Sequence, residues 1–184
     1  MTILIRPYHE TDRTALVELT VTSFRGVSID HNVDLRLGPI AGRDWRWRKG
    51  RDLELDIDTP GSELAVAVDQ ESGKAVGFVT MAVDHDTRIG WIHNLAVQDS
   101  VRGQGLGRRL IEHALDYFRA SGMTVAKIET LEQNSIGRHL YPALGFREVA
   151  RQIHYAMPLV PGATAEGSQD GRAEASRSQP PPTR

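Results

Sequence analysis

The stretch from Ile89 to Arg119 constrains the fold of this chain more than any other part of the sequence. It begins with IGWIHNLAV, whose apolar and aromatic residues predict a strand that ends at Val97. It ends with apolar side chains at helical spacing, which predict a helix from Leu106 to Arg119 that Gly122 closes. A strand, a glycine-rich turn and a helix in direct succession are typical of an α/β protein.

The turn between this strand and this helix predicts an anion-binding site. Backbone N–H groups at the start of a helix point outward, and the helix dipole favours negative charge there. Gly103, Gly105 and Gly107 let the backbone approach phosphate oxygens because glycine has no Cβ atom. Arg102 adds a charged, bidentate donor. The turn therefore indicates a site for phosphate oxygens.

Two better-known phosphate loops do not match this turn. A nucleotide P-loop requires Lys and then Ser or Thr after its last glycine, whereas Gly107 is followed by Arg108 and Arg109. A Rossmann fingerprint requires a glycine three positions after its second, where Arg108 follows Gly105. The short links between the preceding strands also argue against the parallel strand order of that fold.

Periodicity and turn residues predict the remaining elements. Further strands are expected at residues 2–6, 64–68, 75–83 and 124–131, with a closing strand or hairpin arm at 147–159. Further helices are expected at residues 11–24, 44–57 and 135–144, with a loop or broken helix at 26–42. The sum is an α/β (α+β) fold with a mixed, mostly antiparallel central sheet of six to seven strands flanked by about four helices.

Composition narrows the classes of function. Without cysteine, the chain has no disulfides, cysteine-bound zinc or thiol nucleophile, and its seven scattered histidines predict no metal site. A net charge of -2 predicts no nucleic-acid partner. The absence of a long apolar run and of a signal-peptide pattern predicts no membrane contact and a cytoplasmic location. We expect one domain at residues 1–160 and a disordered, Pro/Ser/Gly-rich tail at 161–184.

Two segments resemble motifs of the GNAT superfamily of acyl-CoA-dependent N-acetyltransferases. The sequence VRGQGLGRRL is similar to its coenzyme-A motif, in which Arg or Gln is followed after two residues by Gly, any residue, and Gly or Ala; here these are Arg102, Gly105 and Gly107. The sequence NSIGRHLYPALGF is similar to its later motif, through Asn134, Tyr141, Gly145 and Phe146. The resemblance covers residues 3–158 and implies a GNAT-like fold.

The resemblance implies transfer of an acetyl group from acetyl-CoA to a primary amine of a small molecule, peptide or protein, directly within a ternary complex. The pyrophosphate would rest on the turn that comprises Arg102, Gly103, Gln104, Gly105, Leu106 and Gly107. The pantetheine arm would follow Leu95, Ala96 and Val97, and Asn134 would bond it. Arg108 and Arg109 either hold phosphates or lie on a solvated helix face. We also expect a homodimer, because sheet edges in this architecture often pair.

The same resemblance implies Tyr141 as the acid that protonates the departing thiolate, and a phenol suits this role because it stays protonated at neutral pH. Pro142 disfavours helical backbone at Tyr141, so we expect a shift in the aim of the ring. Three acceptors stay open for the proton of the amine. His93 stands where many family members have Glu, and the alternatives are Glu129 and water.

The segment WRWRKGR, residues 45–51, falls in the region that helps to wall the acceptor groove in similar proteins. It has two interpretations. The basic and aromatic side chains could bind an acidic acceptor, or the Trp residues could pack on the sheet while the charges face solvent. The second arrangement is the commoner one in proteins.

Overall fold

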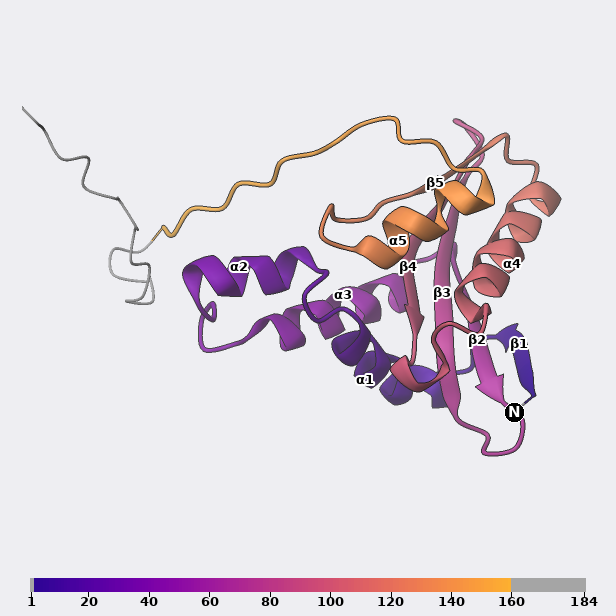
Figure 1. Cartoon of the computed structure of the whole chain (residues 1–184), viewed down its shortest axis with the longest axis horizontal. Helices are drawn as coiled ribbons and strands as arrows, with labels where there is room; N and C mark the ends of the chain where they lie inside the picture. The colour runs from indigo at the N-terminus through magenta and orange to yellow at the C-terminus, as the bar shows by residue number, and fades with distance from the viewer. Residues whose placement is uncertain (1, 160–184) are drawn as a thin grey trace, which may run out of the picture.

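The computed structural model describes residues 2–159, and within them a single sheet carries helices on both faces (Figure 1). The strands are β1 (Ile3–Pro7), β2 (Ser62–Asp69), β3 (Ala75–Asp84), β4 (Ile89–Val97) and β5 (Val125–Ile128). The α-helices are α1 (Arg13–Ser23), α2 (Ile29–Leu37), α3 (Trp45–Asp58), α4 (Leu106–Ala120) and α5 (Ser135–Leu140). Short 3-10 helices are η1 (Glu10–Asp12), η2 (Asp99–Val101) and η3 (Pro142–Leu144). The tail expected at 161–184 lies outside the described residues.

The strand order follows the chain, β1-β2-β3-β4-β5. The first three pairs are antiparallel: short turns join β2 to β3 and β3 to β4, whereas α1, α2 and α3 lie between β1 and β2. The last pair, β4 and β5, is parallel because α4 crosses between the two strands. The predicted mixed, mostly antiparallel sheet is therefore confirmed. Two counts were wrong: residues 2–159 form five strands rather than six to seven, and five α-helices rather than about four.

The missing strand is the one expected at residues 147–159, which have no regular secondary structure and leave the sheet beyond η3 (Figure 1). Their apolar side chains alternate along the sequence, which suits a strand, but Val149 and Tyr155 are each 91% exposed. An alternating pattern shows that a segment could pair. A strand exists only where a neighbour supplies hydrogen bonds, and no strand of the described residues pairs with this segment.

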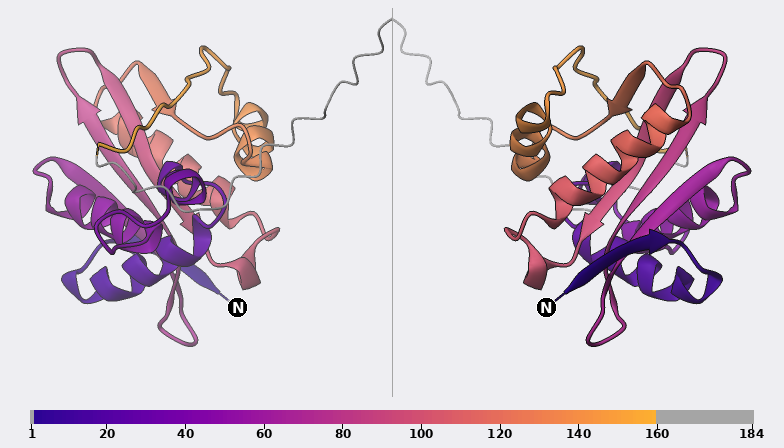
Figure 2. Two further views of the ribbon diagram at one scale, coloured as in Figure 1. Left: turned by 90° about the vertical axis from the view of Figure 1, so that its left-hand side faces the viewer. Right: turned by 90° about the vertical axis from the view of Figure 1, so that its right-hand side faces the viewer.

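Two cores lie on opposite faces of the sheet, with α4 over one and α1 and α3 over the other (Figure 2). Alternate residues of β2 point to opposite faces. Val66 packs with Leu16 and Leu53 of α1 and α3, whereas Ala65 packs with Leu110 of α4. The helix predicted between Leu106 and Arg119 is confirmed as α4, and its apolar stripe is the main cover of the face to which Ala65 points.

The segment predicted as a loop or broken helix contains α2, a regular helix. Ser28 caps it, since its Oγ accepts the backbone N–H of His31 at 3.1 Å. No residue of α2 is buried, so its few apolar residues do not form the wide apolar stripe from which a helix is predicted. No helix within residues 2–159 is long and apolar enough to cross a membrane.

Gly90 sits directly beneath the ring of Phe118, where β4 meets α4. A Cβ atom at this position would lie 2.4 Å from Phe118 Cγ. We expect Gly90→Ala to lower the free energy of unfolding by about 1–3 kcal/mol, because the ring or the helix must shift. Urea denaturation would measure this loss. Combining Gly90→Ala with Phe118→Leu should cost less than the sum of the two single changes, and simple additivity would contradict the steric cause.

Candidate functional site

The two parallel strands separate halfway along β4. The β5 strand pairs only with Ile89 to Ile92. At the next residue the register between β3 and β4 shifts: Met81 is opposite Ile92 and Thr80 is opposite Asn94. His93 is therefore the extra residue of a β-bulge. Beyond this bulge, one edge of β4 has no strand partner within the described residues.

Backbone groups of β4 line this open edge. The N–H of Gln98 donates to Val76 O of β3 at 2.9 Å. Because hydrogen-bonding direction alternates along a strand, Val97 and Leu95 direct their backbone groups away from β3, toward the open edge. The backbone of Ala96 points toward β3, and its side chain is buried against α1 and α3. Of the three β4 residues predicted to hold pantetheine, Leu95 and Val97 can offer backbone hydrogen bonds.

A buried polar network holds the strand next to the bulge. The backbone N–H of Asn94 donates to Thr80 Oγ1 at 2.9 Å, where a regular ladder would use a carbonyl. The side-chain Nδ2 of Asn94 donates to Asp56 Oδ2 at 2.6 Å, and its Oδ1 accepts from Lys49 Nζ at 2.9 Å. Thr80 Oγ1 donates to the same Asp56 oxygen at 3.1 Å. These bonds tie α3 to the sheet at the point where β4 leaves β5.

Asn94 is the centre of this network, and its removal should destabilise the fold. We expect Asn94→Ala to lower the free energy of unfolding by about 1–3 kcal/mol, because Asp56 and Lys49 each lose a buried partner. Chemical denaturation would measure the change. Asn32→Ala is the matched control, since Asn32 bonds Gln133 in an exposed contact and should change stability by less than about 0.5 kcal/mol. Equal losses in the two variants would contradict a special role for Asn94.

The glycine-rich turn has the geometry that its sequence predicts. Gly103 and Gly105 have φ of 75° and 78°, in the left-handed region that favours glycine. Within the described residues, none of the backbone N–H groups from Gly103 to Arg108 donates to a protein acceptor. A Cβ atom at Gly103 or Gly105 would meet nothing within 4 Å. The turn thus presents free donors and open space at the positive end of the α4 dipole.

The three arginines of this region have different surroundings. Arg102 Nε donates to Val97 O at 3.2 Å, and its guanidinium pairs with Asp99 at 2.8 Å. Arg108 lies at the start of α4, where its guanidinium reaches Ala143 O at 3.4 Å. Arg109 donates to Ile3 O at 3.0 Å and so ties α4 to β1. Arg102 and Arg108 therefore adjoin the open turn, and Arg109 is engaged in the fold.

Asn134 and Tyr141 flank the short helix α5. Asn134 is its N-cap: its Oδ1 accepts the N–H of Gly137 at 3.2 Å, and its Nδ2 donates to Thr130 Oγ1 at 2.9 Å. A Cβ atom on Gly137 would lie 2.9 Å from Thr130 Oγ1 and 3.2 Å from Tyr141 Cε2. Gly137 is therefore a small residue that lets these side chains converge. The predicted contact of Asn134 with pantetheine stays a prediction, and the structure shows its capping role.

Tyr141 follows α5 and packs against the core beneath α4. Its backbone is right-handed helical, with φ of -67° and ψ of -46°, although Pro142 disfavours this geometry; the expected shift in the aim of the ring stays a prediction. Pro142 ends α5 and starts η3, which divides the single helix predicted at 135–144. Burial raises the pKa of Tyr141 from 10.0 to about 12, although an interaction with Thr130 opposes the shift. The phenol therefore stays protonated at neutral pH.

The candidate proton acceptors occupy different places. His93 is exposed at the bulge, and its ring stacks on Trp91 with centroids 5.5 Å apart. Glu129 is exposed and directly follows the end of β5. Both residues directly follow the last paired residues of β4 and β5, Ile92 and Ile128, and His93 is in addition the bulge residue.

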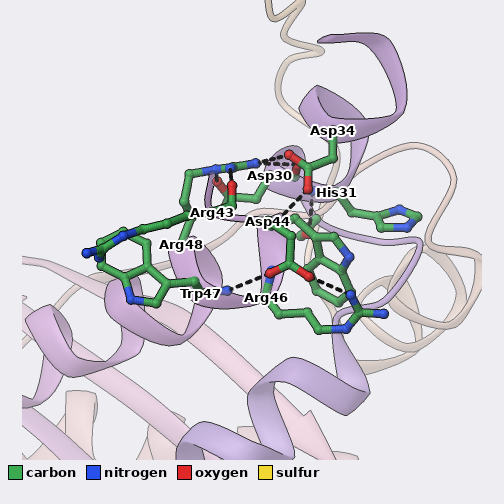
Figure 3. A network of polar contacts seen from close by, with 10 residues as sticks. Asp30, His31, Asp34, Arg43, Asp44, Arg46, Trp47 and Arg48 are labelled. Atoms are coloured by element: carbon green, nitrogen blue, oxygen red, sulfur yellow. Dashed lines mark hydrogen bonds and ion pairs between the residues drawn. The ribbon is translucent and has the colours of Figure 1, made fainter. Parts of the chain in front are cut away.

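The basic segment at 45–51 lies on α3, and Figure 3 shows that aspartates neutralise much of its charge. Arg48 pairs with Asp30 and Asp34 of α2, and Arg46 pairs with Asp44 at 2.6 Å. Trp45 is only 4% exposed, as the second interpretation expected, but Trp47 is 49% exposed, so that interpretation holds for one of the two Trp residues. The charges, however, are mostly in ion pairs with carboxylates, so this segment forms the joint between α2 and α3.

Several residues near the site were not found by reasoning from the sequence: Thr80, Asn94, Asp56, Thr130 and Gly137. Each contributes through partners that are distant in the chain, as Asn94 does with Asp56 and Lys49. The only local signal was a polar Asn in the middle of an apolar strand, where a buried polar side chain requires a partner.

A family model for the acetyltransferase (GNAT) family matches residues 31–146, more than half of the chain. The chain is 30% identical over 96 residues to N-alpha-acetyltransferase 30 of Saccharomyces cerevisiae, which covers 49% of this chain and 54% of that protein. It is 32% identical over 85 residues to the ribosomal protein bS18-alanine N-acetyltransferase of Escherichia coli, which covers 46% and 56%, respectively. The matches thus span about half the length of these curated relatives.

A solved structure of AAC(6')-Iy in complex with the bisubstrate analogue CoA-S-monomethyl-acetylneamine has the same fold. The TM-score is 0.61 at 19% identity, over 86% of this chain and 99% of that one. The same protein has also been solved with CoA, at a TM-score of 0.60 and 19% identity over 85% and 95% of the two chains. At this level of identity the likeness concerns the fold.

Proposed function

The chain belongs to the GNAT acetyltransferase family, and we propose on this basis that it transfers an acetyl group from acetyl-CoA to a primary amine of a small molecule, peptide or protein. The free N–H groups from Gly103 to Arg108 carry the proposal, because they form an open anion site beside the unpaired edge of β4. A diphosphate at this turn would place the rest of acetyl-CoA along that edge, near Leu95 and Val97.

The chemistry is a direct transfer within a ternary complex. The amine nitrogen attacks the thioester carbonyl carbon, the carbon–sulfur bond breaks, and the amine gives up a proton. Backbone N–H groups at the open edge of β4 would polarise the carbonyl. Tyr141 would give its proton to the departing thiolate, and its raised pKa keeps that proton available. The products are an amide and CoA.

The proposal is tested by two measurements on the full chain. A thiol-release assay with acetyl-CoA and a panel of primary amines should detect turnover, and calorimetry should detect acetyl-CoA binding at a single site. Binding without turnover on any amine would instead indicate an acyl-CoA sensor. An absence of acetyl-CoA binding would contradict both functions.

We infer that His93 is the base that accepts the proton of the amine, directly or through one water molecule, because it is the extra residue of the bulge in β4. We expect His93→Gln to lower kcat/KM on the order of a hundredfold without changing acetyl-CoA affinity. Glu129→Gln is the matched variant for the alternative base. A larger loss with Glu129→Gln would transfer the role to that residue, and wild-type rates in both variants would assign it to water.

The homodimer and the cytoplasmic location stay predictions from the sequence. Light scattering on the purified full chain tests the first, since a monomer at micromolar concentration would contradict it.

A further inference from the structure

A hollow lies on the sheet near the tips of β3 and β4. Gly90 and Ile92 face α4, so the alternating residues Ile89 and Trp91 face the opposite side. No helix residue lines the hollow; its walls come from β3, the following turn, β4 and β5, through Ala82, Val83, Asp84, Thr87, Ile89, Trp91, His93 and Lys127. It thus adjoins the bulge through His93.

A stack of three side chains occupies this hollow. Lys127 is opposite Trp91 in the β4–β5 register, and its Nζ lies 3.7 Å from the centroid of the Trp91 ring. On the same ring, His93 stacks at 5.5 Å with an interplanar angle of 16°. A cation over an aromatic face is attracted by the ring quadrupole, so the ring holds the ammonium group in place.

The charge of Lys127 has no anionic partner. Among residues 2–159, no carboxylate lies within 4.0 Å of its Nζ, and the ammonium donates no hydrogen bond to protein. Asp84 lines the hollow, but its Oδ1 accepts the N–H groups of Asp86 at 2.9 Å and Thr87 at 3.2 Å. Glu129 does not line the hollow. A half-buried ammonium beside aromatic walls attracts an external carboxylate more strongly than a fully solvated one does.

The position of Lys127 relative to the bulge sets the reach of such a ligand. Lys127 is level with Trp91, two residues before His93 and four before Leu95. At about 3.3 Å per strand residue, its ammonium is therefore about 7–13 Å from the part of β4 that receives the thioester. The α-amino group of a free amino acid is too close to its carboxylate to span this distance, whereas a peptide of two to four residues is long enough.

We propose that Lys127, held on Trp91, binds a carboxylate of the acceptor, and that the acceptor is a peptide-like amine with this carboxylate about 7–13 Å from its amino group. This inference rests on the proposed function, since it gives the acetylated amine its substrate class. Lys127 is a specificity-determining residue and takes no part in the proton transfers.

The test compares trialanine, which has a free C-terminal carboxylate, with its C-terminal amide. We expect the wild-type protein to favour trialanine in kcat/KM by roughly ten- to hundredfold. Lys127→Met should remove this preference by slowing trialanine, while the rate with the amide changes less than about twofold. Lys127→Gln serves as a second neutral variant if the first does not fold. Lys74→Met, at an exposed lysine in the β2–β3 turn, should keep the wild-type preference.

The outcomes separate this inference from the proposed function. Turnover of both peptides with the same ratio in wild type and Lys127→Met would overturn the inference and leave the acetyltransferase intact. If no amine is acetylated, the proposed function fails. Calorimetry of trialanine with the CoA-loaded protein then shows whether Lys127 binds a carboxylate. Binding that requires Lys127 supports the carboxylate site, and its absence overturns it.

Discussion

Turnover should fall on the order of a hundredfold when Tyr141 is replaced by phenylalanine, because the thiolate then departs without its proton donor. The affinity for acetyl-CoA should stay within about twofold, since the phenyl ring keeps the packing of Tyr141 against the core. Steady-state kinetics and calorimetry measure the two quantities separately. The raised pKa adds a pH signature. At pH 10.0, the ordinary pKa of a tyrosine, the phenol of Tyr141 is still protonated, so wild-type turnover should not fall at this pH through loss of its proton.

The control for this variant is Tyr117→Phe. Tyr117 is a partly buried tyrosine of α4 that packs against the same core, so its substitution reports the cost of losing a hydroxyl group near that core. It should leave turnover unchanged. Unchanged turnover in Tyr141→Phe would reject Tyr141 as the acid and would favour a packing role.

Replacing Gly105 by valine should weaken acetyl-CoA binding on the order of a hundredfold. The change forces a branched side chain into a left-handed backbone and fills the open space beside the free N–H groups. Losing one or two charge-assisted hydrogen bonds, at about 1.5–3 kcal/mol each, is enough for this effect. Calorimetry with acetyl-CoA measures it, and turnover at saturating acetyl-CoA should fall less than affinity does.

Gly122 provides a matched control at the other end of the same helix. Its φ is 76°, and a Cβ atom there would also meet nothing within 4 Å. Gly122→Val should therefore suffer a similar backbone strain and a similar loss in melting temperature, without a loss of acetyl-CoA affinity. If both variants lost affinity equally, the effect would come from destabilisation, and the turn would not be the anion site.

Specificity for an acidic acceptor is expected from Lys127 rather than from the basic segment of α3, which forms the joint between α2 and α3. The basic segment of α3 was the obvious candidate for an acidic acceptor, but Arg48 and Arg46 are paired with aspartates. Lys127 is a single lysine in a short strand, and nothing in its sequence neighbourhood distinguishes it. Charge that is unpaired in the folded chain matters more for recognition than charge that is clustered in the sequence.

Local pattern was sufficient to predict the elements that depend on near neighbours in the chain. The turn before α4 needs left-handed residues and open backbone, and Gly103 and Gly105 are the residues that provide them. The helix α4 follows from its own apolar stripe, which must be buried against a sheet. By the same reasoning α2, with no buried face, left no pattern to find.

The sequence by itself determined the strand–turn–helix unit, the open glycine turn and the two motifs around Asn134 and Tyr141, because these depend on backbone preferences and short spacings. Only the tertiary structure decided the bulge at His93, the Asn94 network and the stack of Lys127 on Trp91. Each of these depends on strand register and on partners tens of residues apart. The alternating pattern of residues 147–159 illustrates the limit. A repeat of two residues predicts which side chains share a face, but it does not predict whether another strand pairs with the segment.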